Sequence, residues 1–188
     1  MRKTTFALAF LSIGLLLAVS CATQHQQAAV NETRTMTSAG LEPLNDAESG
    51  AIAHALNDGE IELARIAVAN ATNPAVRDFA QMIITDHTNA NAMLEREGYA
   101  AAPNSAVNAL DAQVNHMRTM LQSSSGPQFD RTYIAGQIDM HQNALAMVGR
   151  NLQPSAQDRD LRTILTNMRS SVDMHLARAK QLQNEIGK

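Results

Sequence analysis

The chain of 188 residues has little from which a β-sheet or a disulfide-stabilised domain could be built. It contains no tryptophan, aromatic residues make up only 3% of it, and its single cysteine is Cys21. One cysteine excludes an intramolecular disulfide. No segment alternates Val, Ile or Thr with polar residues, as a half-buried strand would. The sequence therefore predicts an all-α protein.

Several motifs that carry enzyme chemistry are also absent. The chain has no Gly-rich loop of the kind that binds phosphate, and its sequence gives no basis for a Ser-His-Asp catalytic triad. Carboxylate-bridged di-iron helical proteins need Glu-x-x-His, but the positions three residues before the candidate histidines hold Ile84, Ile138 and Val172. The net charge of −3 comes with no basic stripe that could neutralise phosphates. We expect a protein that is not an enzyme and does not bind nucleic acid.

The N-terminus reads as an export signal. Residues 1–20 combine Arg2 and Lys3 with a short apolar run, which is typical of a signal peptide rather than a membrane anchor. The stretch AVSC at 18–21 resembles a bacterial lipobox, so Cys21 is predicted to be lipidated and to attach the protein to a membrane. Ala22 is not aspartate, which by resemblance to bacterial sorting rules favours the periplasmic side of the outer membrane. The alternative is a soluble periplasmic protein with an incidental thiol.

The rest of the chain divides into a tether and a helical domain. Residues 21–45 are polar and without periodicity, which indicates a flexible tether. Residues 46–186 form the domain. Asn45 with Glu48 makes a capping box, Pro74 suits a first helical turn, and Pro154 separates the last two helices before a box-like cap of Ser155 with Asp158. The predicted helices span about 46–71, 74–97, 105–121, 128–152 and 156–186.

Four of these helices are long enough to lie alongside one another, at roughly 35 to 45 Å each. Short connections favour antiparallel neighbours, so we expect an antiparallel four-helix bundle with a core of Ala, Leu, Ile and Met. The shorter helix, between the second and third long ones, is expected to cross one end of the bundle or to flank it.

Each long helix directs one ionisable residue inward. Apolar neighbours three, four and seven positions away surround Glu60, His87 and His141, whereas His175 lies nearer an edge. Glu60, His87 and His141 are each about 13 residues from a predicted turn. His175 is about 20 residues from its turn, which would place it roughly 10 Å along the axis from the others.

Two interpretations of these four residues remain open. Three imidazoles with one carboxylate suit zinc, copper or another divalent metal ion. Alternatively, each is a buried polar group satisfied by a hydrogen bond, with no metal involved. Asp86, beside His87 in the sequence, is interpreted as a helix-edge charge. The ten methionines form no Met-x-x-Met series beyond Met117 and Met120, so core filling is favoured over a copper(I) site.

Three stretches carry a family resemblance. They are GEIELARIAVANATNPAVRDFAQMIITDHTNANAML at 59–94, FDRTYIAGQIDMHQNALAMV at 129–148 and MRSSVDMHLARAKQL at 168–182. Together they resemble the bacterial envelope family called domain of unknown function 4142. The resemblance implies a ferritin-like helical bundle, exported to the periplasm or outer membrane, with no established activity. It also implies that Glu60, His87, His141 and His175 occupy the recurring polar positions of the family, although Met140 stands where relatives often have aspartate.

The leading hypothesis is a non-enzymatic, lipid-anchored envelope protein with a binding or structural role. The alternative is a metal-binding or metal-buffering protein that uses Glu60, His87, His141 and His175, with a divalent metal ion as its cofactor. The sequence identifies no protein partner and no oligomeric state.

Overall fold

Two long helices joined by a tight turn begin the described part of the chain. The structure, a computed structural model, describes residues 44–187, and α2 (Asp46–Asn70) and α3 (Pro74–Arg96) come first. The predicted capping box is confirmed, because Asn45 Oδ1 accepts from the Glu48 amide and Glu48 Oε2 accepts from the Asn45 amide, both at 2.9 Å. The predicted signal peptide, Cys21 and nearly all of the predicted tether lie outside the described residues.

The turn between α2 and α3 is held by a residue from another helix. Asp130 is buried, and its carboxylate accepts hydrogen bonds from the backbone amides of Thr72 and Asn73 at 2.9 Å and from the Thr72 hydroxyl. These donors would otherwise be unpaired at the start of α3. At the other end of α3, Gly98 has φ 85°, the left-handed conformation that commonly follows a helix and that glycine adopts without strain.

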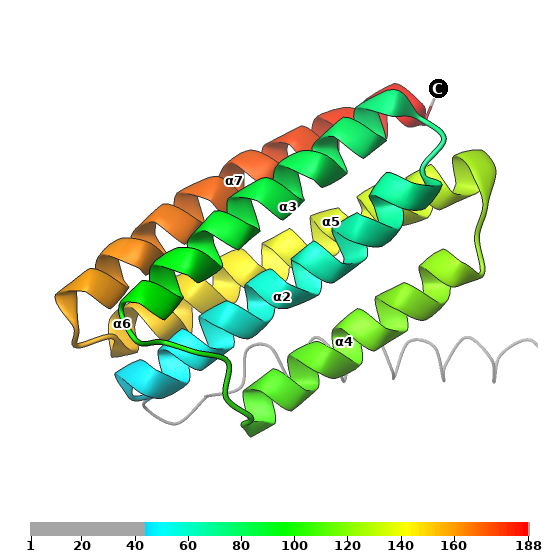
Figure 1. The fold of residues 1–188 in the computed structure, drawn as a ribbon. Helices are drawn as coiled ribbons and strands as arrows, with labels where there is room; N and C mark the ends of the chain where they lie inside the picture. Colours follow the sequence, from blue (N-terminus) through cyan, green and yellow to red (C-terminus); the bar gives the residue numbers. More distant parts are fainter. Residues whose placement is uncertain (1–43, 188) are drawn as a thin grey trace, which may run out of the picture. The chain divides into compact units, whose positions relative to one another are not determined.

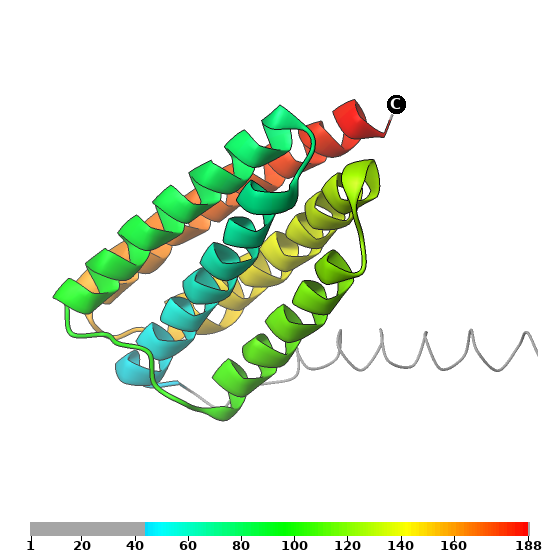
Figure 2. The same ribbon diagram turned by 45° about the vertical axis from the view of Figure 1, so that its right-hand side comes forward.

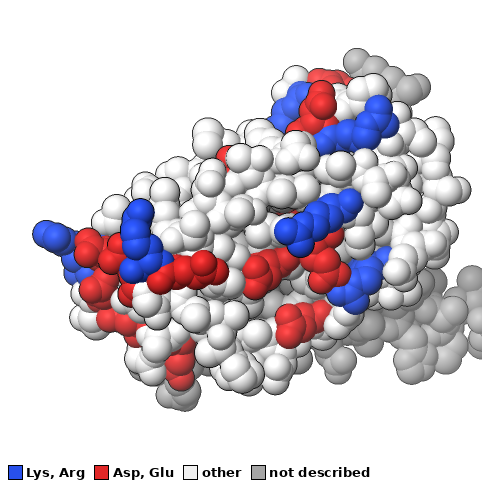
Figure 3. All heavy atoms as spheres, in the orientation of Figure 1, with Lys and Arg blue, Asp and Glu red and all other residues white. Residues whose placement is uncertain are grey.

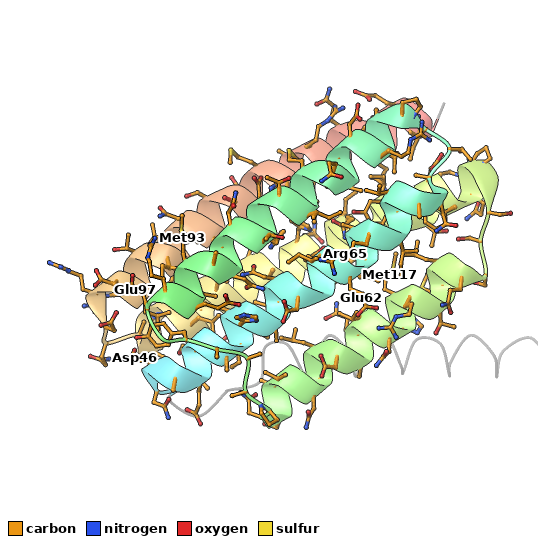
Figure 4. The ribbon with its side chains drawn as sticks, in the orientation of Figure 1. Asp46, Glu62, Arg65, Met93, Glu97 and Met117 are labelled. Carbon is orange, nitrogen blue, oxygen red and sulfur yellow. The ribbon has the colours of Figure 1, made fainter. Side chains whose placement is uncertain are left out.

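The shorter helix α4 (Ser105–Gln122) lies beside α2 (Figures 1 and 2). It flanks the long helices rather than crossing their ends. Its buried side chains fill places where glycine leaves room: a Cβ at Gly59 would come within 2.5 Å of Val114 Cγ2, and one at Gly136 within 2.2 Å of Met117 Cε. Figure 4 shows Met117 between α4 and the long helices. Glycines at these two positions therefore let α4 approach closely.

The turn between the last two long helices does not lie where the sequence predicted it. α5 (Gly126–Met147) runs on through a π-helical segment η1 (Val148–Leu152) and a short α6 (Gln153–Ser155) before α7 (Arg159–Ile186) begins. Pro154 was expected to end the helix, but it sits in the first turn of α6, where the widened π segment accommodates it. Asp158 caps α7, accepting from Asp160 and Leu161, whereas Ser155 makes no cap.

The four long helices surround a common core. α2 packs against α3, α3 against α7, α7 against α5 and α5 against α2, while α4 lies on α2 and α5 (Figures 1 and 2). Residues 44–187 contain helices and no strands, so the all-α prediction is confirmed. None of the helices in this range combines the length and hydropathy that a membrane-spanning segment needs.

The core consists of two apolar clusters with a polar layer between them. One cluster includes Leu63, Ile83 and Leu182, and the other includes Leu94 and Leu165. Each long helix has buried polar residues that lie in sequence between its positions in the two clusters and that form this layer. These residues are Asn57 and Glu60 on α2, His87 and Asn91 on α3, Gln137 and His141 on α5, and His175 on α7.

Charged side chains gather on part of the surface. In the view of Figure 3, acidic groups with a few basic ones cluster at the end where α3 stops and α7 starts. Arg96 with Glu97, and Arg159 with Asp160, form ion pairs there. Because these side chains are mostly exposed, each pair contributes little to stability.

Candidate metal centre

Three histidines from three helices meet in the polar layer. The ring centroids of His87 and His175 are 5.3 Å apart, those of His141 and His175 are 5.4 Å apart, and those of His87 and His141 are 6.1 Å apart. One ring nitrogen of each lies within 4.8 Å of the other two. All three side chains are buried, with relative exposures of 5%, 1% and 1% for His87, His141 and His175.

The tautomer of His87 is fixed by a chain of hydrogen bonds that ends in a carboxylate. Asp58 accepts from the Asn91 amide group at 2.8 Å, Asn91 accepts from Asn57 at 2.7 Å, and Asn57 Oδ1 accepts from His87 Nδ1 at 2.9 Å. Since a carboxylate only accepts, the direction of each bond in the chain follows from the first. Nδ1 of His87 therefore carries the proton, and Nε2 presents a lone pair.

The other two histidines are oriented in the same manner. His141 Nδ1 donates to the backbone carbonyl of Gln137 at 2.9 Å, and His175 Nε2 donates to Asp86 Oδ2 at 2.8 Å. This leaves His141 Nε2 and His175 Nδ1 with lone pairs. Within the described part of the chain, these two atoms and His87 Nε2 are buried and have no hydrogen-bond partner.

The three lone pairs fit a metal ion. A buried nitrogen without a partner costs about 1 to 3 kcal/mol, and three such atoms in one place are rare in native proteins. In metal-ligating histidines the second ring nitrogen usually donates to a carboxylate, a backbone carbonyl or water, as those of His175 and His141 do here. At a metal–nitrogen distance of about 2.0 to 2.1 Å, the ligand atoms lie roughly 3.3 to 3.6 Å apart, which is within the 4.8 Å limit inside which each histidine already places a ring nitrogen.

Burial keeps the three rings neutral. Desolvation, together with the nearby His141 and His175, lowers the pKa of His87 to about 3. It lowers the pKa of His141 to about 4, against the opposing effect of the hydrogen bond to Gln137. The pKa of His175 is also lowered by desolvation, although Asp86 opposes the change. Neutral imidazole is the form that binds metals.

Glu60 lies behind His141 rather than among the free nitrogens. Its Oε1 is 3.4 Å from His141 Nδ1, the ring atom that bears the proton, and its Oε2 accepts from Gln137 Nε2 at 2.7 Å. Desolvation raises the pKa of Glu60 to about 7, against the lowering effects of the Gln137 hydrogen bond and of His175. Glu60 is thus positioned to support His141 and to balance part of a cation's charge.

The sequence-based estimate that His175 lies about 10 Å from the others along the axis is wrong. The error came from the position of the turn: η1 and α6 move it from Pro154 to residues 156–158. His141 is then 15 residues before Ala156, and His175 is 17 residues after Asp158, so the two lie at similar depth.

Asp86, Asn57, Asn91 and Gln137 were not predicted as site residues. Asp86 is a helix-edge residue, as expected, but it also orients His175. Asn91 and Gln137 are four residues from His87 and His141 on the same helix faces. The sequence did contain a signal for these two residues, because each is an inward-facing amide four positions from a candidate histidine.

A surface pocket reaches this layer between α3 and α7. It has a volume of about 230 Å³, and His87, His175 and Asn57 line its inner part. Exposed residues of both helices, among them Asn89, Met93 and Met174, line it as well.

Comparison with known proteins places the chain in a family. Residues 25–182 match the family described as Domain of unknown function (DUF4142). The chain belongs to this family. The DUF4142 chain is also similar in fold to a solved structure described as "CopM in the Cu(II)-bound form", with a TM-score of 0.61, 18% sequence identity and coverage of 77% of this chain and 99% of that one. No match was found among curated proteins.

Proposed function

We propose that this DUF4142 protein binds one transition-metal ion through His87 Nε2, His141 Nε2 and His175 Nδ1. The main support for the proposal is that three buried ring nitrogens have no hydrogen-bond partner. On each of these rings the other nitrogen donates a hydrogen bond. A purely structural polar layer would be expected to pair these atoms with one another or with other side chains.

The surroundings favour a metal ion of the imidazole-binding group. Three neutral imidazoles bring no charge, while Asp86 and Glu60 contact the protonated nitrogens of His175 and His141 and supply negative charge close by. Copper(II) and zinc both suit imidazole ligands. Copper is the first ion to test, because the similar fold of CopM was solved in a Cu(II)-bound form.

For the type of fold and the location of the protein, we propose what the sequence predicted. We propose a ferritin-like four-helix bundle, in which α4 is the additional helix, held by a lipid on Cys21 at the periplasmic side of the outer membrane. The role is non-enzymatic: binding or buffering of the ion. The three histidines with the open pocket beside them support binding, and the signal peptide predicted from the sequence of residues 1–20 supports the location.

The test is a metal titration of the purified protein carrying Cys21→Ser, which removes the only thiol. We expect about one Cu(II) or Zn(II) ion per chain by mass spectrometry of metals after dialysis, and its loss in His87→Ala and in His141→Ala. His54→Ala is the matched control. His54 is also buried, but both its ring nitrogens are bonded, to Asp58 and to Glu95, and it lies outside the three-histidine group. Equal metal content in all variants, or none in the parent protein, would contradict the proposal.

A further inference from the structure

The pocket between α3 and α7 joins the three-histidine centre to the surface. Its inner part includes His87 and His175, whose Nε2 and Nδ1 atoms are buried and unpartnered among the described residues. Its outer part includes Met93, exposed to 39%, and Met174, exposed to 62%. Figure 4 shows Met93 on α3, where that helix lies against α7. A small ion could therefore reach the histidines from this side.

The exposure of these two methionines needs an explanation. In residues 44–187, only three large hydrophobic side chains are exposed, all of them methionines, and two of the three line this one pocket. A third methionine that lines the pocket, Met168, is buried. Met93 and Met174 are 81 positions apart, so no sequence motif would reveal the pair.

The charge of the residues that line the pocket also suits a cation. Its lining residues among those described include Asp86 and several amide or hydroxyl side chains, but no Lys or Arg. Thioether sulfur is a soft ligand that selects copper(I), while imidazole binds copper as well as zinc, nickel and iron. Copper is the metal common to the two kinds of ligand. Zinc would gain nothing from the thioethers.

We propose that the α3–α7 pocket is the access route to the histidines and that Met93 and Met174 bind copper(I) at its mouth during uptake. This inference rests on the proposed metal-binding function and names copper as its physiological ion. Uptake through the pocket would be faster for copper(I) than in a protein without the thioethers, because the ion exchanges between sulfur ligands and imidazole without returning to water.

The thioethers are tested by their removal. In stopped-flow transfer of copper(I) from a coloured chelator to the Cys21→Ser protein, we expect Met93→Leu with Met174→Leu to slow uptake by about tenfold, which corresponds to about 1.4 kcal/mol in the barrier. Leucine keeps the volume and the apolar character of methionine. Zinc(II) uptake should be unchanged. The control is Met120→Leu, which removes the third exposed methionine, on α4 and outside the pocket.

The access route through the α3–α7 pocket is tested by placing a bulky side chain in it. Ser171 lines the pocket, whereas its neighbour Ser170 is exposed and outside it. Ser171→Trp should slow uptake of both copper(I) and zinc(II), and Ser170→Trp should slow neither, with one ion bound at equilibrium in each variant. Unchanged rates in Ser171→Trp and in the double methionine variant, with metal still bound by the histidines, would overturn this inference alone. Absence of metal binding in the parent protein would instead overturn the proposed function.

Discussion

Replacement of His141 by leucine separates a binding role from a structural one. His141 is 1% exposed, its Nδ1 donates to a backbone carbonyl, and its Nε2 has no partner in the described residues. If the three histidines serve to bind a metal ion, the metal-free protein carries an energetic cost at this position. His141→Leu should then remove the cost together with the metal site.

The magnitude follows from the contacts. The unpartnered Nε2 costs about 1 to 3 kcal/mol, and leucine eliminates it. The Nδ1 hydrogen bond is worth about 0.5 to 1.5 kcal/mol, but the Gln137 carbonyl that accepts it is part of the α5 backbone and is not left isolated. Leucine also adds apolar burial next to Ala144, so the metal-free variant should be as stable as the parent or up to about 2 kcal/mol more stable.

The assay is urea unfolding of metal-free protein, followed by circular dichroism, with and without added metal. The parent should be stabilised by metal and His141→Leu should not be. His54→Leu is the control, because both ring nitrogens of His54 are bonded; this variant should lose about 1 to 2 kcal/mol and still respond to metal. A loss of more than about 2 kcal/mol in metal-free His141→Leu would indicate instead that the imidazole is structural and that it does not serve to bind a metal ion.

Three further predictions concern pH, packing and the membrane anchor. The free energy of unfolding of the metal-free protein should fall between pH 6.5 and pH 4 in urea titrations, because burial lowers the pKa of the site histidines, two of them to about 3 and about 4, and only the unfolded chain takes up these protons. Glu60, with its pKa raised to about 7, opposes this fall over the same range, because the folded protein keeps a proton that the unfolded chain releases. The effect of three histidines on the free energy of unfolding is larger than that of one carboxyl group. Gly59→Ala should destabilise the protein by about 1 to 3 kcal/mol and Gly136→Ala by less, because the first meets a branched valine and the second the flexible end of a methionine; thermal melting measures both. Cys21→Ser should abolish palmitate incorporation and release the protein from membranes, and unchanged membrane association would count against the anchor.

Helical periodicity was sufficient to predict which residues face the interior. The spacing of apolar neighbours predicted that His87 and His141 point inward, and both are buried. It also predicted the long helices and the α2 capping box. These features depend on residues within one or two helical turns, which is why the sequence reveals them.

Features that depend on the relation between helices were not predictable. The depth of His175 was misjudged because a π-helical segment carries the chain past Pro154, and no local signal in that stretch distinguishes a kink from a break. The partners of the histidines were missed because Asn57 meets His87 only when α2 packs against α3, and Asp86 meets His175 only when α3 packs against α7. The sequence alone does not determine which helices are neighbours.

The most direct test of the three-histidine metal site is anomalous diffraction from crystals of the Cys21→Ser protein soaked in Cu(II) or Zn(II). The proposed site predicts one buried peak at about 2.0 to 2.1 Å from His87 Nε2, His141 Nε2 and His175 Nδ1. A peak bonded instead to the Nδ1 atoms of His87 or His141, a peak only at surface residues, or an empty centre at saturating metal would contradict it.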